Sequence, residues 1–395
     1  MERWLARSPG RILRLVDRTD AADTSGAGRA VRRRPVRGRR PGRRRLCGCG
    51  GLVVLGSLLA TVPVVAQETI PSIREVLPPG VSRRVDRSIE RGIEFLLANR
   101  DSHGFWSGWE YSHEIYRCAI TALVGHALLA RGSTPRRGPH AEIVDEITNY
   151  LIGCSTTNGL ITSGSRNEQR PMYSHGLAMA FLAQVLGQTG DKERREEIRR
   201  VLHKAVTLSE RAQTDDGGWG YGPSLRADEG TLTVTQLQGL RACRDAGILV
   251  PKRIIDRGVE YIRRSSRPDG YVRYRVHSSR YRDGVTCAAV VALWNAGEYE
   301  SELFRRTARC VNENIGMGWD RGHHREYITY YLAQAKWVQG RDIWKKFYRH
   351  AAPYMVRLQR PDGSWEGSDG GDVFGTAVAL IVLQLPYNRL PVYQR

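Results

Sequence analysis

The chain has 395 residues, of which 41% are hydrophobic and 26% charged, and its formal net charge is +20 at pH 7. This length and apolar content suffice for a sizeable core, which excludes a wholly disordered chain. Only one apolar run approaches the length needed to span a bilayer, which excludes a polytopic membrane protein.

The excess of basic residues is concentrated at the N-terminus, where residues 1–66 hold 15 arginines against four acidic residues. Residues 1–45 form a basic leader, and residues 46–66 form an uncharged apolar run that ends in small residues. This order is typical of an export signal, either cleaved or retained as a membrane anchor, and argues against a nucleic-acid-binding arm. We therefore expect a periplasmic or cell-envelope protein that has no nucleic-acid partner and associates with the membrane if residues 46–66 are retained.

Five cysteines follow the leader, at positions 118, 154, 243, 287 and 310. Their odd number and wide spacing indicate no disulfide framework. Most of them fall in apolar helical stretches, so we expect them to behave as small buried hydrophobic residues.

Residues 67–82 are expected to form a linker, and residues 83–395 a single repeat domain. A turn containing glycine, in most copies with a nearby aromatic residue, recurs along that domain. The turns contain Gly104 and Trp106, Gly159, Gly217 and Trp219, Gly270 and Tyr271, Trp319, and Gly363 and Trp365. From Gly104 to Gly363 there are five intervals of about 52 residues, which is room for two helices per unit.

The two helices of each unit differ in character. Charged amphipathic stretches suit an outer layer: Arg84–Asn99, Arg194–Gln213, Pro251–Ser265 and Arg341–Gln359. Stretches with less charge and many small residues suit an inner layer: Tyr116–Ala130, His175–Gly187, Thr231–Ala246, Val285–Gly297, Tyr327–Gly340 and Phe374–Leu385. No strand-like alternation is found over residues 83–390. The pattern predicts an all-α fold of about six inner and six outer helices, arranged either as a closed α/α toroid or as an open solenoid.

Several of these turns resemble the QW motif of the squalene cyclase and protein prenyltransferase repeat family. The motif has a basic residue followed by glycine or alanine, then an aromatic residue, leucine, glutamine and Gly-x-Trp. Matching positions are Arg91, Gly92, Phe95, Leu96, Gly104 and Trp106 in unit one; Lys204, Ala205, Gln213, Gly217 and Trp219 in unit three; and Tyr354, Gln359, Gly363 and Trp365 in unit six. The resemblance spans roughly residues 83–390 and implies a toroid of the terpenoid cyclase type.

The resemblance also implies an apolar central cavity that binds or cyclises an isoprenoid lipid, with polar groups at the starts of the inner helices. Cyclases of this type use an Asp-x-Asp-Asp cluster, which this sequence lacks. The nearest acidic candidates are Asp228 and Glu229 before the third inner helix, with Asp372 before the sixth. An acidic residue before a helix is also a common N-cap, so capping is the alternative role.

Prenyltransferases of the family hold zinc through aspartate, cysteine and histidine. The weak counterpart here is Asp283, Cys287 and His324, for which a helix cap and a buried cysteine are the alternative. We therefore expect no metal and no cofactor.

Aromatic and histidine side chains at the starts of inner helices are candidates for ligand binding. The candidates are Tyr116, His175, Tyr327 and Tyr331, and Trp109, Tyr111, Tyr173 and Tyr330 could also line a cavity. Aromatic faces would stabilise a carbocation, while packing between the layers is the alternative. Two functions stay open: a cyclase-like isomerase acting on isoprenoids, and a non-catalytic exported ring that binds a lipid or serves as a scaffold at the cell envelope.

Overall fold

The computed structural model divides the chain into two units, Met1–Val64 and Val65–Arg395. It describes residues 73–110, 113–165, 168–225, 227–317, 319, 324–368, 370–390 and 393. The expected leader (residues 1–45) and export segment (residues 46–66) lie outside these ranges. Among the described helices, none has both the length and the apolar character needed to cross a bilayer.

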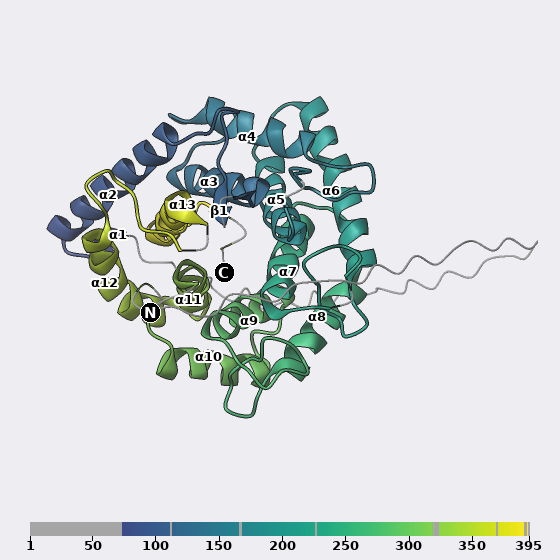
Figure 1. Ribbon diagram of the computed structural model, residues 1–395. Helices are drawn as coiled ribbons and strands as arrows, with labels where there is room; N and C mark the ends of the chain where they lie inside the picture. Colours follow the sequence, from purple (N-terminus) through teal and green to yellow (C-terminus); the bar gives the residue numbers. More distant parts are fainter. Residues whose placement is uncertain are drawn as a thin grey trace, which may run out of the picture. The chain divides into compact units, whose positions relative to one another are not determined.

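The second unit is a double-layered ring of helices, and Figure 1 shows the inner helices surrounded by the outer ones. The outer layer consists of α2 (Pro79–Ala98), α4 (Ala141–Gly153), α6 (Lys192–Ala212), α8 (Lys252–Ser265), α10 (Glu302–Asn314) and α12 (Arg341–Leu358). The inner layer consists of α3 (Arg117–Arg131), α5 (Pro171–Leu186), α7 (Gly230–Asp245), α9 (Asp283–Ala296), α11 (Arg325–Val338) and α13 (Gly371–Gln384). The predicted all-α toroid is confirmed.

The turn between an outer and an inner helix is built from its glycine, tryptophan and glutamine. In unit three, Gly217 has a φ of +91°, and a Cβ there would lie 2.4 Å from the carbonyl oxygen of Arg257 on α8. The Trp219 indole donates to the carbonyl of Ser209 at 2.7 Å. The Gln213 amide donates to the carbonyls of Gly217 and Ile254, both at 2.9 Å. The turn of one unit is therefore fixed to the outer helix of the next.

The same contacts close the ring between the last unit and the first. The Gln359 amide donates to the carbonyl of Ser88 on α2 at 2.8 Å. Gly363 has a φ of +93°, and a Cβ there would lie 2.4 Å from the carbonyl oxygen of Arg91. Helix α13 packs against both α2 and α3. The two ends of the array thus meet, which excludes the open solenoid.

Small residues let the inner helices approach closely, as their composition predicts. A Cβ on Gly239 of α7 would lie 2.7 Å from the carbonyl oxygen of Gly176 on α5. A Cβ on Gly125 of α3 would lie 2.4 Å from the Phe181 ring. Larger residues at these positions would force the inner layer apart.

Two expectations differ from the structure. The expected linker, residues 67–82, is largely helical where it is described: α1 (Ile73–Val76) and the start of α2 occupy it. Helix α1 contacts α2 and α12, and its Ile73 and Val76, which share one face of the helix, belong to the hydrophobic core. The expected absence of strands is wrong for Gly108–Glu110 (β1) and His113–Ile115 (β2), which pair antiparallel. Strands of three residues are too short to show the alternation that identifies a strand in a sequence.

Candidate functional site

The starts of the inner helices bring a buried carboxyl group together with tyrosines. All inner helices run in the same direction because each follows one outer helix, so their N-termini share one end of the ring. Glu229 is the N-cap of α7 and only 1% exposed. Its Oε1 accepts from the Leu232 backbone N–H at 2.9 Å and the Tyr173 hydroxyl at 3.0 Å, and Oε2 accepts from the Thr231 N–H at 3.0 Å. The Thr231 hydroxyl is a further donor.

Six tyrosines from the starts of inner helices and the loops before them gather near this carboxyl group; we call them the tyrosine cluster. Its members are Tyr116, Tyr173, Tyr221, Tyr274, Tyr327 and Tyr331.

Direct contacts connect most members of the cluster. Tyr173 lies edge-on to Tyr116, with ring centroids 5.9 Å apart, and 6.4 Å from Tyr221. The hydroxyls of Tyr221 and Tyr274 are 2.5 Å apart. Tyr327 lies 4.7 Å from Tyr331.

Glycine at position 284 makes room for one of these rings. A Cβ on Gly284 of α9 would lie 2.7 Å from the Tyr327 ring. The Tyr327 hydroxyl is buried and makes no hydrogen bond within the described part of the chain.

Burial dominates the electrostatics of this site. It raises the pKa of Glu229 above the usual range of a glutamate, although hydrogen bonds from Thr231, Leu232 and Tyr173 oppose the shift. Burial, followed by the charges of nearby groups that include Glu229, raises the pKa values of Tyr173 and Tyr327 well above normal. The phenols of Tyr173 and Tyr327 are therefore neutral at physiological pH, and Glu229 retains a proton more readily than an exposed glutamate does.

The other acidic candidates lie elsewhere. Asp228 precedes Glu229 in extended backbone, so the two side chains point in opposite directions. Asp228 Oδ2 accepts from the Thr214 hydroxyl at 2.8 Å, and its charge acts on Tyr261 of the outer helix α8. Asp372 is 39% exposed at its side chain and pairs with Arg360 at 2.7 Å. The structure thus separates Asp228 and Asp372 from Glu229.

His175 faces the outer layer. Its Nδ1 accepts from the Ile161 backbone N–H at 3.2 Å, and its Nε2 lies 3.1 Å from the Ser209 hydroxyl on α6. Burial lowers the pKa of His175 to about 4. Two positions along a helix turn the side chain by about 200°, so His175 and Tyr173 point to opposite sides of α5.

The zinc alternative gains no support from the described residues. Asp283 and Cys287 lie one turn apart on α9, and His324 caps α11 in a left-handed conformation. Burial, followed by the charge of Asp283, raises the pKa of Cys287, which favours a thiol over the thiolate that binds zinc. Within the described ranges, no three histidine, cysteine or acidic side chains are placed to hold a metal ion together.

Side chains from α7 and α11, the two inner helices on either side of α9, meet on the side of the inner layer that faces the ring axis. The Gln238 amide on α7 donates to Gln334 Oε1 on α11 at 2.8 Å. Near the other end, Tyr393 is buried, with its hydroxyl 2.7 Å from that of Tyr330. The Trp337 indole donates to the Tyr393 carbonyl at 2.6 Å. Polar side chains and Tyr393 therefore occupy space that the resemblance assigns to an apolar cavity.

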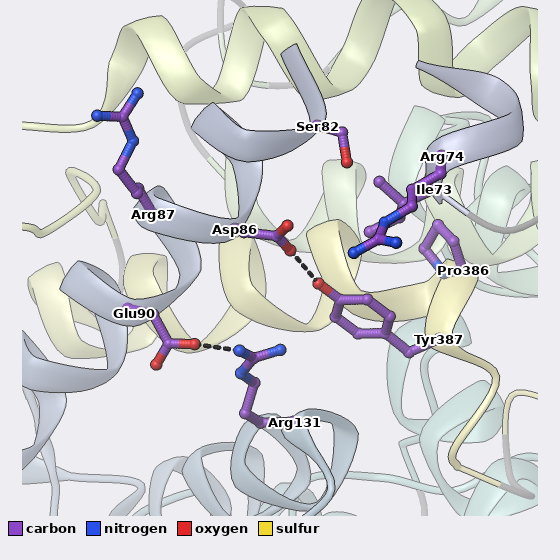
Figure 2. Close-up of a pocket in the computed structure, with 9 residues that line it drawn as sticks. All are labelled: Ile73, Arg74, Ser82, Asp86, Arg87, Glu90, Arg131, Pro386 and Tyr387. Carbon is purple, nitrogen blue, oxygen red and sulfur yellow. Dashed lines mark hydrogen bonds and ion pairs between the residues drawn. The ribbon is translucent and has the colours of Figure 1, made fainter. Parts of the chain in front are cut away.

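A separate hollow of about 510 Å³ lies between α1, the first half of α2 and the C-terminal ends of inner helices. Figure 2 shows its charged wall, where Arg131 pairs with Glu90 and the Tyr387 hydroxyl donates to Asp86 at 2.6 Å. No sequence motif indicated this hollow, because its lining comes from opposite ends of the domain.

Tyr221, Tyr274 and Thr231 are the members of the site that the sequence reasoning missed. Tyr221 and Tyr274 each follow the glycine of their turn by four residues, at Gly217 and Gly270. That shared spacing is a signal that could have identified both.

Comparisons with known proteins support the fold assignment. No family model matches the chain, and no curated protein matches it by sequence. A solved structure of a protein from Actinoplanes is similar at 19% identity with a TM-score of 0.55, covering 77% of this chain and 99% of that one. A variant of the type II terpene cyclase MstE from Scytonema, in complex with geranylgeranyl dihydroxybenzoate, is similar at 17% identity with a TM-score of 0.56, covering 80% and 100%. The MstE complex with merosterolic acid A has 16% identity and a TM-score of 0.56, covering 79% and 99%. The chain therefore has a terpenoid-cyclase-like fold.

Proposed function

We propose that this ring binds an isoprenoid or other apolar lipid at the tyrosine cluster, with Glu229 as the acid that donates a proton to an alkene of the ligand. The observation that carries the proposal is a buried carboxyl group of raised pKa surrounded by neutral phenol rings. The similarity to MstE, whose structure holds a geranylgeranyl compound, supports this class of ligand.

The surroundings of Glu229 suit both the protonated acid before the transfer and the carboxylate that remains after it. Burial raises the pKa of the carboxyl group, which favours its acid form relative to an exposed glutamate. When the proton moves to an alkene carbon, the π electron pair forms the new C–H bond and a carbocation remains. The donors from Thr231, Leu232 and Tyr173 stabilise the carboxylate left behind, and tyrosine faces stabilise the cation.

The alternative is a ring that binds a ligand without chemistry, and a specific observation favours it. The contact between Gln238 and Gln334 and the buried Tyr393 occupy the axial side of the inner helices. A long polyprenyl chain would need these side chains to move, whereas a compact ligand at the tyrosine cluster would not.

The experiment combines lipid binding with turnover. Native mass spectrometry of the purified protein, with lipid extraction and metal analysis on the same sample, identifies any bound molecule. Farnesol, geranylgeraniol and squalene are then incubated with the protein, and products are analysed by gas chromatography and mass spectrometry.

Glu229→Gln and Asp228→Asn form a matched pair of variants, because the two acids are adjacent but face opposite sides. We expect turnover to be lost in Glu229→Gln and retained in Asp228→Asn, with melting temperatures measured for both. Binding without turnover in the wild type would favour the non-catalytic alternative. Absence of both a co-purifying lipid and prenol binding would contradict the proposal.

We further propose that residues 46–66 direct the chain across the cytoplasmic membrane, as a cleaved signal or a retained anchor. The proposal depends on the order of basic and apolar residues in the leader. It is independent of the tyrosine cluster.

A further inference from the structure

Two cysteines that are far apart in the sequence meet where α3 begins and α4 ends. Cys118 is the second residue of α3, and Cys154 is the C-cap of α4. The Cys118 sulfur lies 3.8 Å from the Tyr150 hydroxyl oxygen. The two thiols and the Tyr150 hydroxyl lie close enough to perturb one another's pKa values.

The two thiols differ in exposure and acidity. Cys118 is completely buried, whereas Cys154 is only half-buried. The hydrogen bond from Cys118 lowers the pKa of Cys154, and the Tyr150 hydroxyl and the charge of Arg117 act in the same direction. The hydrogen bond to Cys154, together with burial, raises the pKa of Cys118. The accessible sulfur is thus the better thiolate, and the buried sulfur retains its proton.

We propose that Cys154 and Cys118 form an intramolecular disulfide bond, with Cys154 as the sulfur that reacts first. The oxidant is a small-molecule disulfide such as oxidised glutathione. The Cys154 thiolate attacks one sulfur of the oxidant, which forms a mixed disulfide and releases one glutathione thiolate. Cys118 then attacks the Cys154 sulfur, which releases the second glutathione as a thiolate.

This exchange conserves protons and electrons. The proton of Cys118 passes to a released glutathione thiolate. The two protein sulfurs lose two electrons, and the oxidant takes them up. No metal or further reagent is needed.

The proposed bond would tie together two segments that lead to the tyrosine cluster. Tyr116 directly precedes the first turn of α3, and the chain after Cys154 runs to Glu168, which accepts a hydrogen bond from Ser174 of α5. Oxidation would therefore fix the start of α3 relative to the loop that precedes α5. An oxidising compartment would favour this form, but the proximity of the sulfurs does not depend on localisation.

The test uses the reduced full-length protein in native buffer with oxidised glutathione, followed by alkylation of free thiols and digestion without reductant. We expect a peptide pair joined through Cys118 and Cys154, with a mass about 2 Da below the sum of the two reduced peptides. Cys243, which is fully buried, should resist alkylation of the folded protein and so report that the fold is intact.

Three variants separate the steps. In Cys118→Ala, the mixed disulfide cannot be resolved, so Cys154 should retain a glutathione adduct of about 305 Da. In Cys154→Ala, Cys118 should carry no adduct because it is buried. In the control Cys243→Ala, the bond between Cys118 and Cys154 should form as in the wild type.

Three results would overturn the proposal. One is wild-type protein in which Cys154 keeps its glutathione adduct while Cys118 stays a free thiol. The second is a linkage of Cys118 or Cys154 to another cysteine, and the third is no reaction at Cys154. Each would show that the two sulfurs do not form the proposed bond in the folded ring.

Discussion

Replacing Trp365 with alanine would remove the side chain that fills the junction between the last and first units of the ring. Trp365 is 0% exposed, and its indole donates to the Met355 carbonyl at 2.7 Å. Its ring lies against α2, where a Cβ on Gly92 would be 2.8 Å from Cζ3. Helix α2 already approaches this closely, so the surroundings can collapse only partly into the vacated space.

The expected cost follows from that geometry. Truncating a fully buried tryptophan to alanine lowers the free energy of unfolding by about 3–5 kcal/mol. For a ring of this size, the loss corresponds to a fall in melting temperature of roughly 4–7 °C. Urea unfolding followed by far-ultraviolet circular dichroism measures the free energy directly.

Trp219→Ala is the matched control, because Trp219 occupies the equivalent place between two internal units. It is also 0% exposed, and its indole donates to the Ser209 carbonyl at 2.7 Å. In a closed ring the two variants should lose similar stability. A loss below about 1 kcal/mol for Trp365→Ala alone would mean that α12 and α2 do not pack in solution. A loss that small in both variants would refute the packing role of the turns.

Three other predictions follow from the turns, from a buried histidine and from the leader. Gly363→Ala should destabilise the ring more than Gly247→Ala. Both glycines have positive φ, but only at Gly363 would a Cβ collide with backbone atoms, which belong to Arg91. Equal losses of the free energy of unfolding in urea would contradict this prediction. Burial lowers the pKa of His175 to about 4, so unfolding takes up a proton below about pH 6.5 and stability should fall by up to about 3 kcal/mol as pH falls from 6.5 to about 4. Burial also lowers the pKa of His126 to about 4, so His175→Gln should reduce that dependence without removing it, and an unchanged slope would oppose the assignment. A reporter fused after Gln67 should be found outside the cytoplasm, and an unprocessed cytosolic fusion would exclude an export signal.

The turn residues made the fold predictable, and the structure shows why. Gly217 and Gly363 fit only where the backbone reverses with positive φ against the next outer helix. Trp219 and Trp365 fill equivalent places and make equivalent hydrogen bonds. Where the glutamine is replaced by Arg100, the guanidinium still donates to the turn carbonyl of Gly104 and pairs with Glu146 on the next outer helix. A side chain that performs one local task in each unit leaves a repeat that can be read in the sequence.

The candidate site was only partly predictable. The sequence placed Glu229, Tyr116, Tyr327 and Tyr331 at the starts of inner helices, and the structure brings them into one region. The sequence could not show which of Glu229 and Asp228 faces the tyrosine cluster, because the direction of each side chain depends on the backbone just before α7.

The amino-acid sequence by itself determined the all-α repeat of inner and outer helices, because the helix periods, small inner residues and turn glycines are local properties repeated about every 52 residues. Tertiary structure decided what meets across that ring. It closed the array through Gln359 and Ser88, placed Cys118 beside Cys154, and surrounded Glu229 with tyrosines from several units. These contacts join residues separated by dozens to hundreds of positions, so they depend on how whole helices pack and leave no periodic trace in the sequence.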